Sequence, residues 1–273
     1  MFDRIGIIGT GAMGGAVARL ITHAAPDCTL FLSNRTREKA QKLSEECPNA
    51  RATDNAEIAN SCDLIVLAVK PQIMPEVLRA LSPVFASRPD RFVLVTMAAG
   101  LTTETIQTLA GGTYPVIRIM PNTPIAVGAG VVTYCAKDVS DGELSAFTAL
   151  LSDAGTLDSL PESMIDAASA LAGCGPAFVD LFIEALADGA VACGLPRDKA
   201  LLYAAQTVEG AAKTARETGE HPGRLKDVVC SPAGSTIQGV RALEKGGFRS
   251  AAMEAVIAAY ERNLALKEIP ADR

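Results

Sequence analysis

The chain has 273 residues, of which 49% are hydrophobic and 21% charged, as is typical of a globular protein of about two domains. Its net charge of −6 provides no electrostatic footprint for nucleic acid, and no run of basic residues favours a membrane surface. We expect an N-terminal domain over residues 1–157 and a C-terminal domain over residues 158–273.

The chain opens with a short apolar run at residues 5–8 that predicts a buried strand. Residues 9–14 follow with the sequence Gly-Thr-Gly-Ala-Met-Gly, and residues 12–24 predict a helix. This is a G-x-G-x-x-G motif between a strand and a helix, the context in which the motif binds the pyrophosphate of a dinucleotide. An ordinary glycine-rich turn is the alternative.

Each glycine of this motif has its own physical role. Gly9 permits the tight turn, Gly11 lets a pyrophosphate approach the backbone, and Gly14 lets the helix pack closely against the strand. The helix N-terminus adds amide donors and the positive end of the helix dipole. The predicted cofactor contacts in this turn are Gly9, Thr10, Gly11, Ala12, Met13 and Gly14.

Strands and helices alternate through the rest of the first half. Apolar runs at residues 29–32, 64–69, 92–95 and 116–119 predict strands with helical intervals between them, among them a helix at 37–46. This rhythm predicts an α/β fold of Rossmann type with a doubly wound parallel sheet. Residues 131–134 predict an edge strand, and residues 141–153 predict a last helix.

The end of the second strand indicates which nicotinamide cofactor binds. An acidic residue there favours NAD, whereas an arginine favours the 2′-phosphate of NADP. Residues 32–37 read Leu-Ser-Asn-Arg-Thr-Arg, so Arg35 can fork onto that phosphate while Ser33 and Asn34 add hydrogen bonds. The alternative is a solvated helix start, where cations are unfavourable. We therefore expect NADPH, with NADH used less well.

Two further stretches follow predicted strand ends, where the ligands of open α/β sheets bind. They are Val69, Lys70, Pro71 and Gln72, and then Ala98, Ala99 and Gly100. We predict that both stretches contact the cofactor. For Lys70, an ordinary surface lysine is the alternative.

Alanine-rich helices replace strands after about residue 157. The predicted helices cover residues 164–172, 177–193, 197–217, 235–245 and 249–266, with Pro196, Pro222 and Pro232 at expected helix starts and Gly194 and Gly219 at helix ends. Residues 185–192 carry small or apolar side chains around most of the helix, which must then be buried on more than one side. We predict an all-α dimerisation domain covered by a second subunit. A self-contained bundle is the alternative.

One loop of this half is suited to binding an anion. Residues 226–236 end in serine, glycine and threonine and open a helix at about Ser235. Such a helix start presents free amides toward a negative charge, although an N-cap without a ligand is the alternative. Residues 171–178 break one helix and begin another with small residues, which allows close backbone contact.

The sequence offers no conventional catalytic set. It has no Ser-His-Asp candidate, its seven cysteines form no C-x-x-C pair, and its two histidines are too few for a metal cluster. We expect no metal and no disulfide framework, so the cofactor must supply the chemistry. No apolar stretch reaches the roughly 18 residues of a membrane span, and the first strand leaves no place for a signal peptide, so we expect a cytoplasmic protein.

These motifs resemble, in order and over nearly the whole chain, the pyrroline-5-carboxylate reductase family. The resemblance is carried by residues 9–14, 69–72, 118–124, 173–177 and 225–236, of which the last stretch is the most specific. It implies reduction of the cyclic imine 1-pyrroline-5-carboxylate to L-proline by NAD(P)H, the last step of proline biosynthesis. It also implies a homodimer with interlocked helical domains, which in this family often assembles into a ring of dimers.

The resemblance also implies roles for single residues. The substrate carboxylate is expected on the amides around Gly234, Ser235 and Thr236, with the Thr236 hydroxyl reaching the ring nitrogen as the catalytic group. Asn55 and Arg35 are expected at the adenosine ribose and its phosphate, and Ala98 at the nicotinamide. Glu162 matches a position near the substrate, although a solvated helix start is the alternative.

The chain departs from the family pattern at a few positions. Ala172, Cys174 and Phe178 replace two serines and a tyrosine, and Ala233 stands where glycine is usual. These changes remove hydrogen bonds but no essential acid, so they concern substrate recognition rather than the reaction. Two other functions stay open at this point: reduction of another imine or a 2-hydroxy acid, and a non-catalytic NADP-binding sensor.

Overall fold

The computed structural model describes residues 2–267, and these form two compact units. Unit 1 consists of residues 2–174 together with 259–267, and unit 2 consists of residues 175–258. The chain thus leaves unit 1 after Cys174 and returns to it at Ala259. This division lies further along the chain than the boundary at residue 157 expected from the sequence, which stays a prediction.

An eight-stranded sheet forms the centre of unit 1, in the order β3-β2-β1-β4-β5-β6-β7-β8. Neighbouring strands are parallel except β6 and β7, which run antiparallel. The strands are β1 (Arg4–Ile8), β2 (Thr29–Ser33), β3 (Ala50–Ala52), β4 (Leu64–Leu67), β5 (Val93–Thr96), β6 (Val116–Pro121), β7 (Gly130–Lys137) and β8 (Gly155–Ser159). The predicted Rossmann-type sheet is confirmed as mostly parallel.

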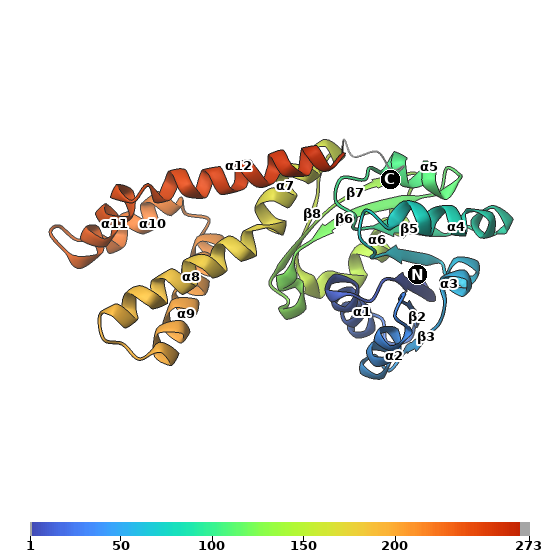
Figure 1. The fold of residues 1–273 in the computed structure, drawn as a ribbon, viewed down its shortest axis with the longest axis horizontal. Helices are drawn as coiled ribbons and strands as arrows, with labels where there is room; N and C mark the ends of the chain where they lie inside the picture. Colours follow the sequence, from blue (N-terminus) through green and yellow to red (C-terminus); the bar gives the residue numbers. More distant parts are fainter. Residues whose placement is uncertain (1, 268–273) are drawn as a thin grey trace. The chain divides into compact units, whose positions relative to one another are not determined.

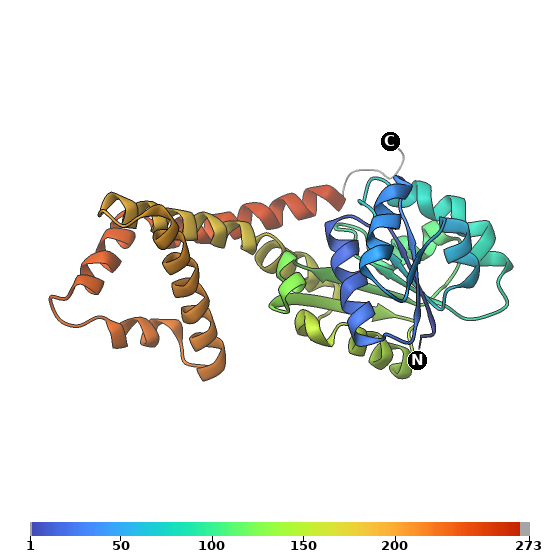
Figure 2. The same cartoon turned by 90° about the horizontal axis from the view of Figure 1, so that it is seen from below.

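Helices cover both faces of this sheet (Figure 1). One core contains residues of α1 (Ala12–Ala24), α2 (Arg37–Glu46) and α6 (Asp141–Leu150), and Figure 2 looks onto α1 and α2 in front of the strands. The other core contains residues of α3 (Asn55–Ser61), α4 (Met74–Ser87) and α5 (Thr103–Ala110). Strand residues alternate between the two cores, Ile7 in the first and Ile8 in the second. This two-sided burial explains the continuous apolar runs of the sequence.

The sequence analysis predicted most strands of unit 1 correctly and was wrong about one edge of the sheet. The stretch expected as an edge strand at 131–134 is β7, which lies between β6 and β8, so that prediction was wrong. The two outer strands, β3 and β8, were missed because neither carries an apolar run: β3 has only three residues, and β8 is mostly exposed. The helix expected over 141–153 ends at Leu150, and a short 3₁₀ turn, η2 (Ser152–Ala154), follows it.

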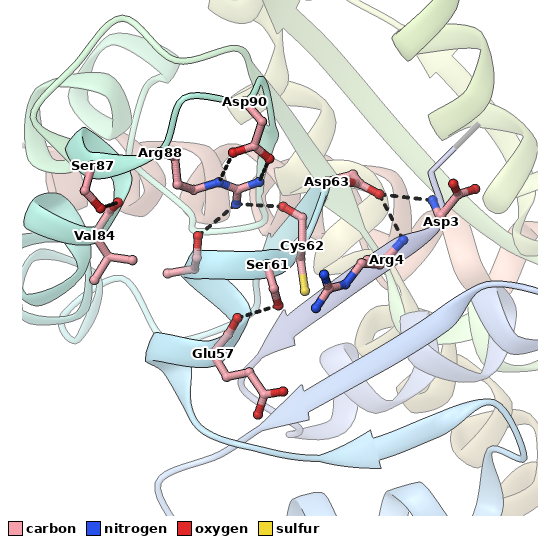
Figure 3. Close-up of polar contacts among 11 residues, drawn as sticks. Asp3, Arg4, Glu57, Ser61, Cys62, Asp63, Val84, Ser87, Arg88 and Asp90 are labelled. Carbon is pink, nitrogen blue, oxygen red and sulfur yellow. Dashed lines mark hydrogen bonds and ion pairs between the residues drawn. The ribbon is translucent and has the colours of Figure 1, made fainter.

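A buried arginine fixes the end of α3 (Figure 3). The side chain of Arg88 is only 2% exposed, and its Nη1 donates to the carbonyl oxygens of Ala59 and Cys62, each at 2.8 Å. Asp90 accepts from the same guanidinium. Burial raises the pKa of the Cys62 thiol to about 12, so this thiol stays protonated and packs as an apolar group.

Unit 2 consists of helices. They are α8 (Gly175–Ala192), α9 (Arg197–Thr218), α10 (Pro222–Val229), α11 (Ser235–Lys245) and most of α12 (Phe248–Lys267), whose last turns belong to unit 1. Helices α8 and α9 pack against each other (Figure 1), but their buried contact consists of only three alanines, Ala187, Ala200 and Ala204. Large apolar side chains of this unit are exposed in the single chain: Val179, Leu181, Leu186, Leu201, Leu202, Tyr203, Val228, Val229, Leu243, Phe248, Met253 and Ile257.

The helical half contains one helix that the sequence analysis did not list and one misplaced start. Helix α10 was missed, although Pro222 does occupy its first turn as expected. Pro232 does not begin a helix. It lies in a turn before α11, in which Ala233 adopts the left-handed conformation with φ of +59° and Gly234 is the N-cap. Gly194 and Gly219 end their helices with positive φ, as predicted.

One stretch of the chain is a candidate membrane span, although the sequence analysis expected none. Residues 162–192 are long and apolar enough, by length and composition, to cross a membrane, so the expectation of no such stretch was wrong. The most apolar window of this stretch is only 11% buried within the single chain. A single helix of this kind is weak evidence for a membrane, because a helix covered by other protein chains has the same composition.

Candidate functional site

The glycine-rich turn after β1 has the geometry that a dinucleotide requires. Gly9 has a φ of +104°, and a side chain there would lie 2.7 Å from the carbonyl oxygen of Ala68. A side chain at Gly14 would lie 2.0 Å from the Gly9 oxygen, so both positions need glycine for packing. At Gly11 the space within 4 Å is open, which leaves room for a ligand against the backbone.

The side chain of Asn34 ties this turn to the end of β2. Its Oδ1 accepts from the amide of Thr10 at 3.2 Å, and its Nδ2 donates to the carbonyl of Thr36 at 3.0 Å. The amide of Gly9 also donates to the carbonyl of Ser33 at 2.8 Å. The buried Thr10 hydroxyl has no hydrogen-bond partner among the described residues.

A cavity of about 720 Å³ opens beside the end of β2. The hydroxyl of Ser33 donates to Oδ1 of Asn55 at 2.6 Å within its wall, so these two predicted cofactor residues lie together. The wall also contains the predicted residues Asn34 and Arg35. The sequence analysis missed Ala52, Thr53 and Asp54 because it missed β3, which leads into them. The lining is Ser33, Asn34, Arg35, Arg37, Ala52, Thr53, Asp54, Asn55, Ala56, Glu57, Ala80 and Leu81.

The charges in this cavity favour an anion. Glu57 is paired with Arg51, and the Asp54 carboxylate accepts from the Glu57 amide at 2.8 Å as the N-cap of α3. Arg35 and Arg37 are exposed and form no ion pair with any residue between 2 and 267. Two cations without carboxylate partners therefore line the cavity, a composition suited to a phosphate.

The other two predicted cofactor stretches meet at the carboxyl edge of the sheet. Leu67 of β4 pairs with Thr96 of β5, so residues 69–72 and 98–99 follow adjacent strand ends. The Gly9 turn lies beside them, since a side chain there would also be 3.1 Å from the amide of Val69. The structure brings the three cofactor stretches together, with Lys70 exposed and Ala98 buried.

Glu162 holds several parts of unit 1 together. Its carboxylate accepts from the amide of Thr103 at 2.8 Å and from the Thr103 hydroxyl at 2.9 Å, at the start of α5. It also pairs with the buried guanidinium of Arg118 at 3.3 Å, and Arg118 binds Asp166 at 2.9 Å. These contacts give Glu162 a structural role, and its contact with substrate stays a prediction.

The predicted substrate loop belongs to unit 2. The amide of Gly234 donates to the carbonyl of Ser231 at 3.0 Å, which closes the turn before α11. The first turn of α11 has no acidic residue and no side-chain cap. Ser235 and Thr236 are exposed, and the Thr236 hydroxyl makes no hydrogen bond within the described chain. The helix start is thus open to an anion, while the cofactor residues all lie in unit 1.

Neither metals nor disulfides enter this site in the part of the chain that the structure describes. Residues 2–267 contain no group of three or more histidine, cysteine, aspartate or glutamate side chains able to hold a metal ion. The seven cysteines are free. Burial and the negative charge of Glu162 raise the pKa of the Cys135 thiol to about 11, so this thiol too stays protonated.

Two family profiles match separate parts of the chain. Residues 162–266 match the profile of pyrroline-5-carboxylate reductase dimerisation. Residues 4–100 match that of NADP oxidoreductase coenzyme F420-dependent. A structure of ketol-acid reductoisomerase from an uncultured archaeon, at 12% identity and a TM-score of 0.63, shares only the fold.

Relatives at 32–42% identity match nearly the whole chain. The pyrroline-5-carboxylate reductase of Synechocystis sp. is 42% identical, covering 96% of this chain and 98% of its own length. That of Methanosarcina acetivorans is also 42% identical, with coverages of 96% and 97%. The NADP-bound structure of the Plasmodium falciparum enzyme has a TM-score of 0.86 at 32% identity and covers 97% of this chain and 98% of its own. The chain belongs to the pyrroline-5-carboxylate reductase family.

Proposed function

We propose that this chain reduces 1-pyrroline-5-carboxylate to L-proline with NADPH, the last step of proline biosynthesis. The observation that carries the proposal is that one chain contains both a dinucleotide-binding unit and a matching dimerisation domain. Unit 1 has the glycine turn and a cationic cavity, and the dimerisation profile spans residues 162–266. NADH is used less well, because the two unpaired arginines are of no use to a cofactor without the 2′-phosphate.

The residues present fit the cofactor. The amides after Gly9 receive the pyrophosphate, and the open space at Gly11 allows its approach. Arg35 binds the 2′-phosphate, while Ser33 and Asn55 face the adenosine ribose. Residues 69–72 and 98–99 then lie where the nicotinamide half of the molecule extends along the sheet edge. NADPH, when bound, supplies the hydride of the reaction.

The open start of α11 binds the substrate in this proposal. The amides around Gly234, Ser235 and Thr236 hold the substrate carboxylate, because they carry no side-chain cap. The Thr236 hydroxyl has no hydrogen-bond partner among residues 2–267, and in this proposal it hydrogen-bonds the ring nitrogen. Thr236 thereby keeps the proton on that nitrogen, either directly or through a water.

The chemistry requires no further acid from the chain. An imine accepts hydride at carbon more readily when its nitrogen is protonated, and the neighbouring carboxylate of the substrate stabilises that cation. The new C–H bond forms at the ring carbon, the C=N electron pair moves to nitrogen, and the amine of L-proline results. Orientation supplies the rest, because holding the reacting carbons about 3–3.5 Å apart is worth ~7–11 kcal/mol.

The exposed apolar side chains of unit 2 favour a homodimer, in which a second copy covers them. We extend this proposal to a ring of dimers, as in the family, and to a location in the cytoplasm. Sedimentation of the purified protein at micromolar concentration tests the assembly, with a particle larger than two chains as the expected result. Fractionation of the source cells tests the location.

A substrate panel tests the activity. The purified chain should oxidise NADPH steadily when 1-pyrroline-5-carboxylate is added, and L-proline should accumulate in equal amount. Turnover of a 2-hydroxy acid in place of the imine would move the chain to another reductase activity. Binding of NADPH without turnover of any imine would indicate a sensor.

A further inference from the structure

A π-helical turn precedes the point at which the chain leaves unit 1. Residues 162–173 form a 3₁₀ turn η3 (Glu162–Met164), a helical turn α7 (Ile165–Ala168) and the π-helical turn η4 (Ser169–Gly173). The amide of Cys174 donates to the carbonyl of Ser169 at 3.2 Å, the five-residue spacing of a π-helix. Such turns cost stability relative to an α-helix and are frequent at functional sites.

A proline explains why this turn needs an outside donor. In a regular α-helix the carbonyl of Ala172 would accept from the amide four residues later, which belongs to Pro176. Proline has no N–H, so that bond cannot form. Asn122 replaces it: its Nδ2 donates to the carbonyl of Ala172 at 3.0 Å.

Asn122 is itself rigidly held at the sheet edge that binds ligands. It directly follows β6 and is 8% exposed. Its Oδ1 accepts from the amide of Val131 at 2.8 Å, so both ends of its side-chain amide are bonded within unit 1. Ligands of such folds lie over the carboxyl ends of the parallel strands, where Asn122 stands. The π-turn is therefore attached to the carboxyl edge of the sheet.

The chain before the π-turn is fixed by separate contacts. The buried guanidinium of Arg118, on β6, binds the Asp166 carboxylate at 2.9 Å. Asn263, on the returning end of α12, donates from Nδ2 to the Asp166 carbonyl at 3.2 Å. The Asn122 side chain thus bonds to the π-turn and to Val131, and it forms none of the contacts that attach the preceding helix. This separation lets its role be tested alone.

We propose that Asn122 is a positioning residue for imine reduction: its amide holds the π-turn at residues 169–173 in the shape that the reactive end of the site requires. The inference rests on the proposed function. Asn122 touches neither reactant in this proposal, since its side chain is occupied by Ala172 and Val131. Its loss should disturb the presentation of the imine and leave the binding of NADPH at Arg35 intact.

Two substitutions at Asn122 test this role. Asn122→Asp keeps the acceptor for Val131 and loses the donor to Ala172, and Asn122→Ala loses both. We expect each to lower kcat/KM for 1-pyrroline-5-carboxylate by about tenfold or more, because small misplacements at a reacting centre have effects of this size. The dissociation constant of NADPH should stay within about twofold. Hydrogen exchange should accelerate at residues 169–174.

Asn49→Asp is the matched control. Asn49 lies at the amino edge of the sheet, before β3, and its Nδ2 donates to the carbonyls of Ala25 and Cys28 at 3.2 and 3.1 Å. The same chemical change there should lower the melting temperature and leave kcat/KM unchanged. If the Asn122 variants behave like this control, or if their NADPH affinity falls as much as kcat/KM, the positioning role is wrong.

A second substitution distinguishes a positioning role of Asn122 from a role that only provides a hydrogen bond to the Ala172 carbonyl. Pro176→Ala restores an N–H at the position from which an α-helix would donate to Ala172. The double variant Asn122→Ala/Pro176→Ala is compared with Pro176→Ala alone. We expect the second change to recover the melting temperature but not kcat/KM, because an α-helical hydrogen bond does not restore the π-turn. Recovery of both would overturn the inference. A wild-type chain inactive on the imine would instead refute the proposed function.

Discussion

Unit 1 and unit 2 differ in how much of their apolar surface their own chain covers. Unit 1 buries two clusters of large side chains, one on each face of its sheet. Unit 2 buries three alanines and leaves leucines, valines and aromatic residues exposed. Burying a large apolar side chain is worth about 1.5–3 kcal/mol, so the chain alone leaves much of this free energy unused in unit 2.

This difference shows that the two halves obtain their stability from different sources. Unit 1 has the contacts of an independent domain. The exposed side chains of unit 2 have the composition of a protein interior, so a second copy is required to bury them. This agrees with the dimerisation profile that matches residues 162–266. The substitutions below test that contrast, from the largest expected effect to the smallest.

The contrast between the two units would be wrong if the exposed apolar surface of unit 2 tolerated a charged residue. Leu181 is 68% exposed in the single chain, and Leu181→Arg would place a cation in the covered interface. We expect loss of the dimer and of activity, measured by light scattering after size exclusion. Val127→Arg, at an 80% exposed valine of unit 1, is the control and should stay dimeric. A dimeric Leu181→Arg variant would show that unit 2 is self-contained.

The buried ion pairs of unit 1 should give the next largest effect. Arg118→Met removes the guanidinium that binds Asp166, whose side chain is 3% exposed, and should lower the free energy of unfolding by about 3–5 kcal/mol. Denaturant titration measures this loss. Arg19→Met removes an exposed pair with Glu46 and should cost less than about 1 kcal/mol. Equal losses in the two variants would contradict the buried role of Arg118.

Thr236→Ala tests the only catalytic hydroxyl proposed in unit 2. Loss of one hydrogen bond to the ring nitrogen should lower kcat about tenfold, with the fold and the dimer intact. Steady-state kinetics with the imine measures the change. Thr207→Ala removes a hydroxyl that bonds only the Tyr203 carbonyl of its own helix and serves as the control. An unchanged kcat in Thr236→Ala would remove Thr236 from the mechanism.

Arg35→Ala tests cofactor choice in unit 1. Removal of a charge-assisted hydrogen bond should raise the KM for NADPH about tenfold and change that for NADH little. The ratio of the two KM values is the measurement. Arg19→Ala removes an exposed arginine that is paired with Glu46, and neither residue lines the cavity, so this control should leave that ratio near the wild-type value. Equal effects on both cofactors in Arg35→Ala would contradict the phosphate assignment.

The smallest effect concerns a pH-dependent cap in unit 1. Arg91 and the capping contacts of Ser140 lower the pKa of Glu143 from 4.5 to about 2. This stabilisation is fully present above pH 4.5 and is lost as the pH falls toward 2. Glu143→Gln should therefore cost on the order of 1 kcal/mol at pH 7 and progressively less below pH 4.5, measured by thermal unfolding. A constant cost across this range would rule out the ion pair as the cause.

The sequence predicts a feature well where the feature is local. Strand β1 and helix α1 were located correctly because an apolar run and three glycines of fixed spacing leave little freedom. The dinucleotide edge followed from the rule that ligands bind where parallel strands end. Strands β3 and β8 have no buried residue and no apolar run, and they were missed.

Features that depend on long-range contacts were not visible in the sequence. The contacts of Glu162 with Thr103 and Arg118, which lie 59 and 44 residues away, were not foreseen, while its predicted contact with substrate stays a prediction. The π-turn depends on a donor from Asn122, and no periodic pattern records a partner fifty residues distant. The full extent of the cofactor cavity likewise required knowing which loops meet beside β2.

The sparse interior of unit 2 makes this reductase sensitive to dilution. The three buried alanines of unit 2 provide little apolar contact, so a second chain must provide the rest. Folding of unit 2 is then coupled to dimerisation, and its stability depends on the protein concentration. Specific activity should then decline below the dissociation constant of the dimer and return on concentration. A cell could thereby tune output through expression level without any effector molecule.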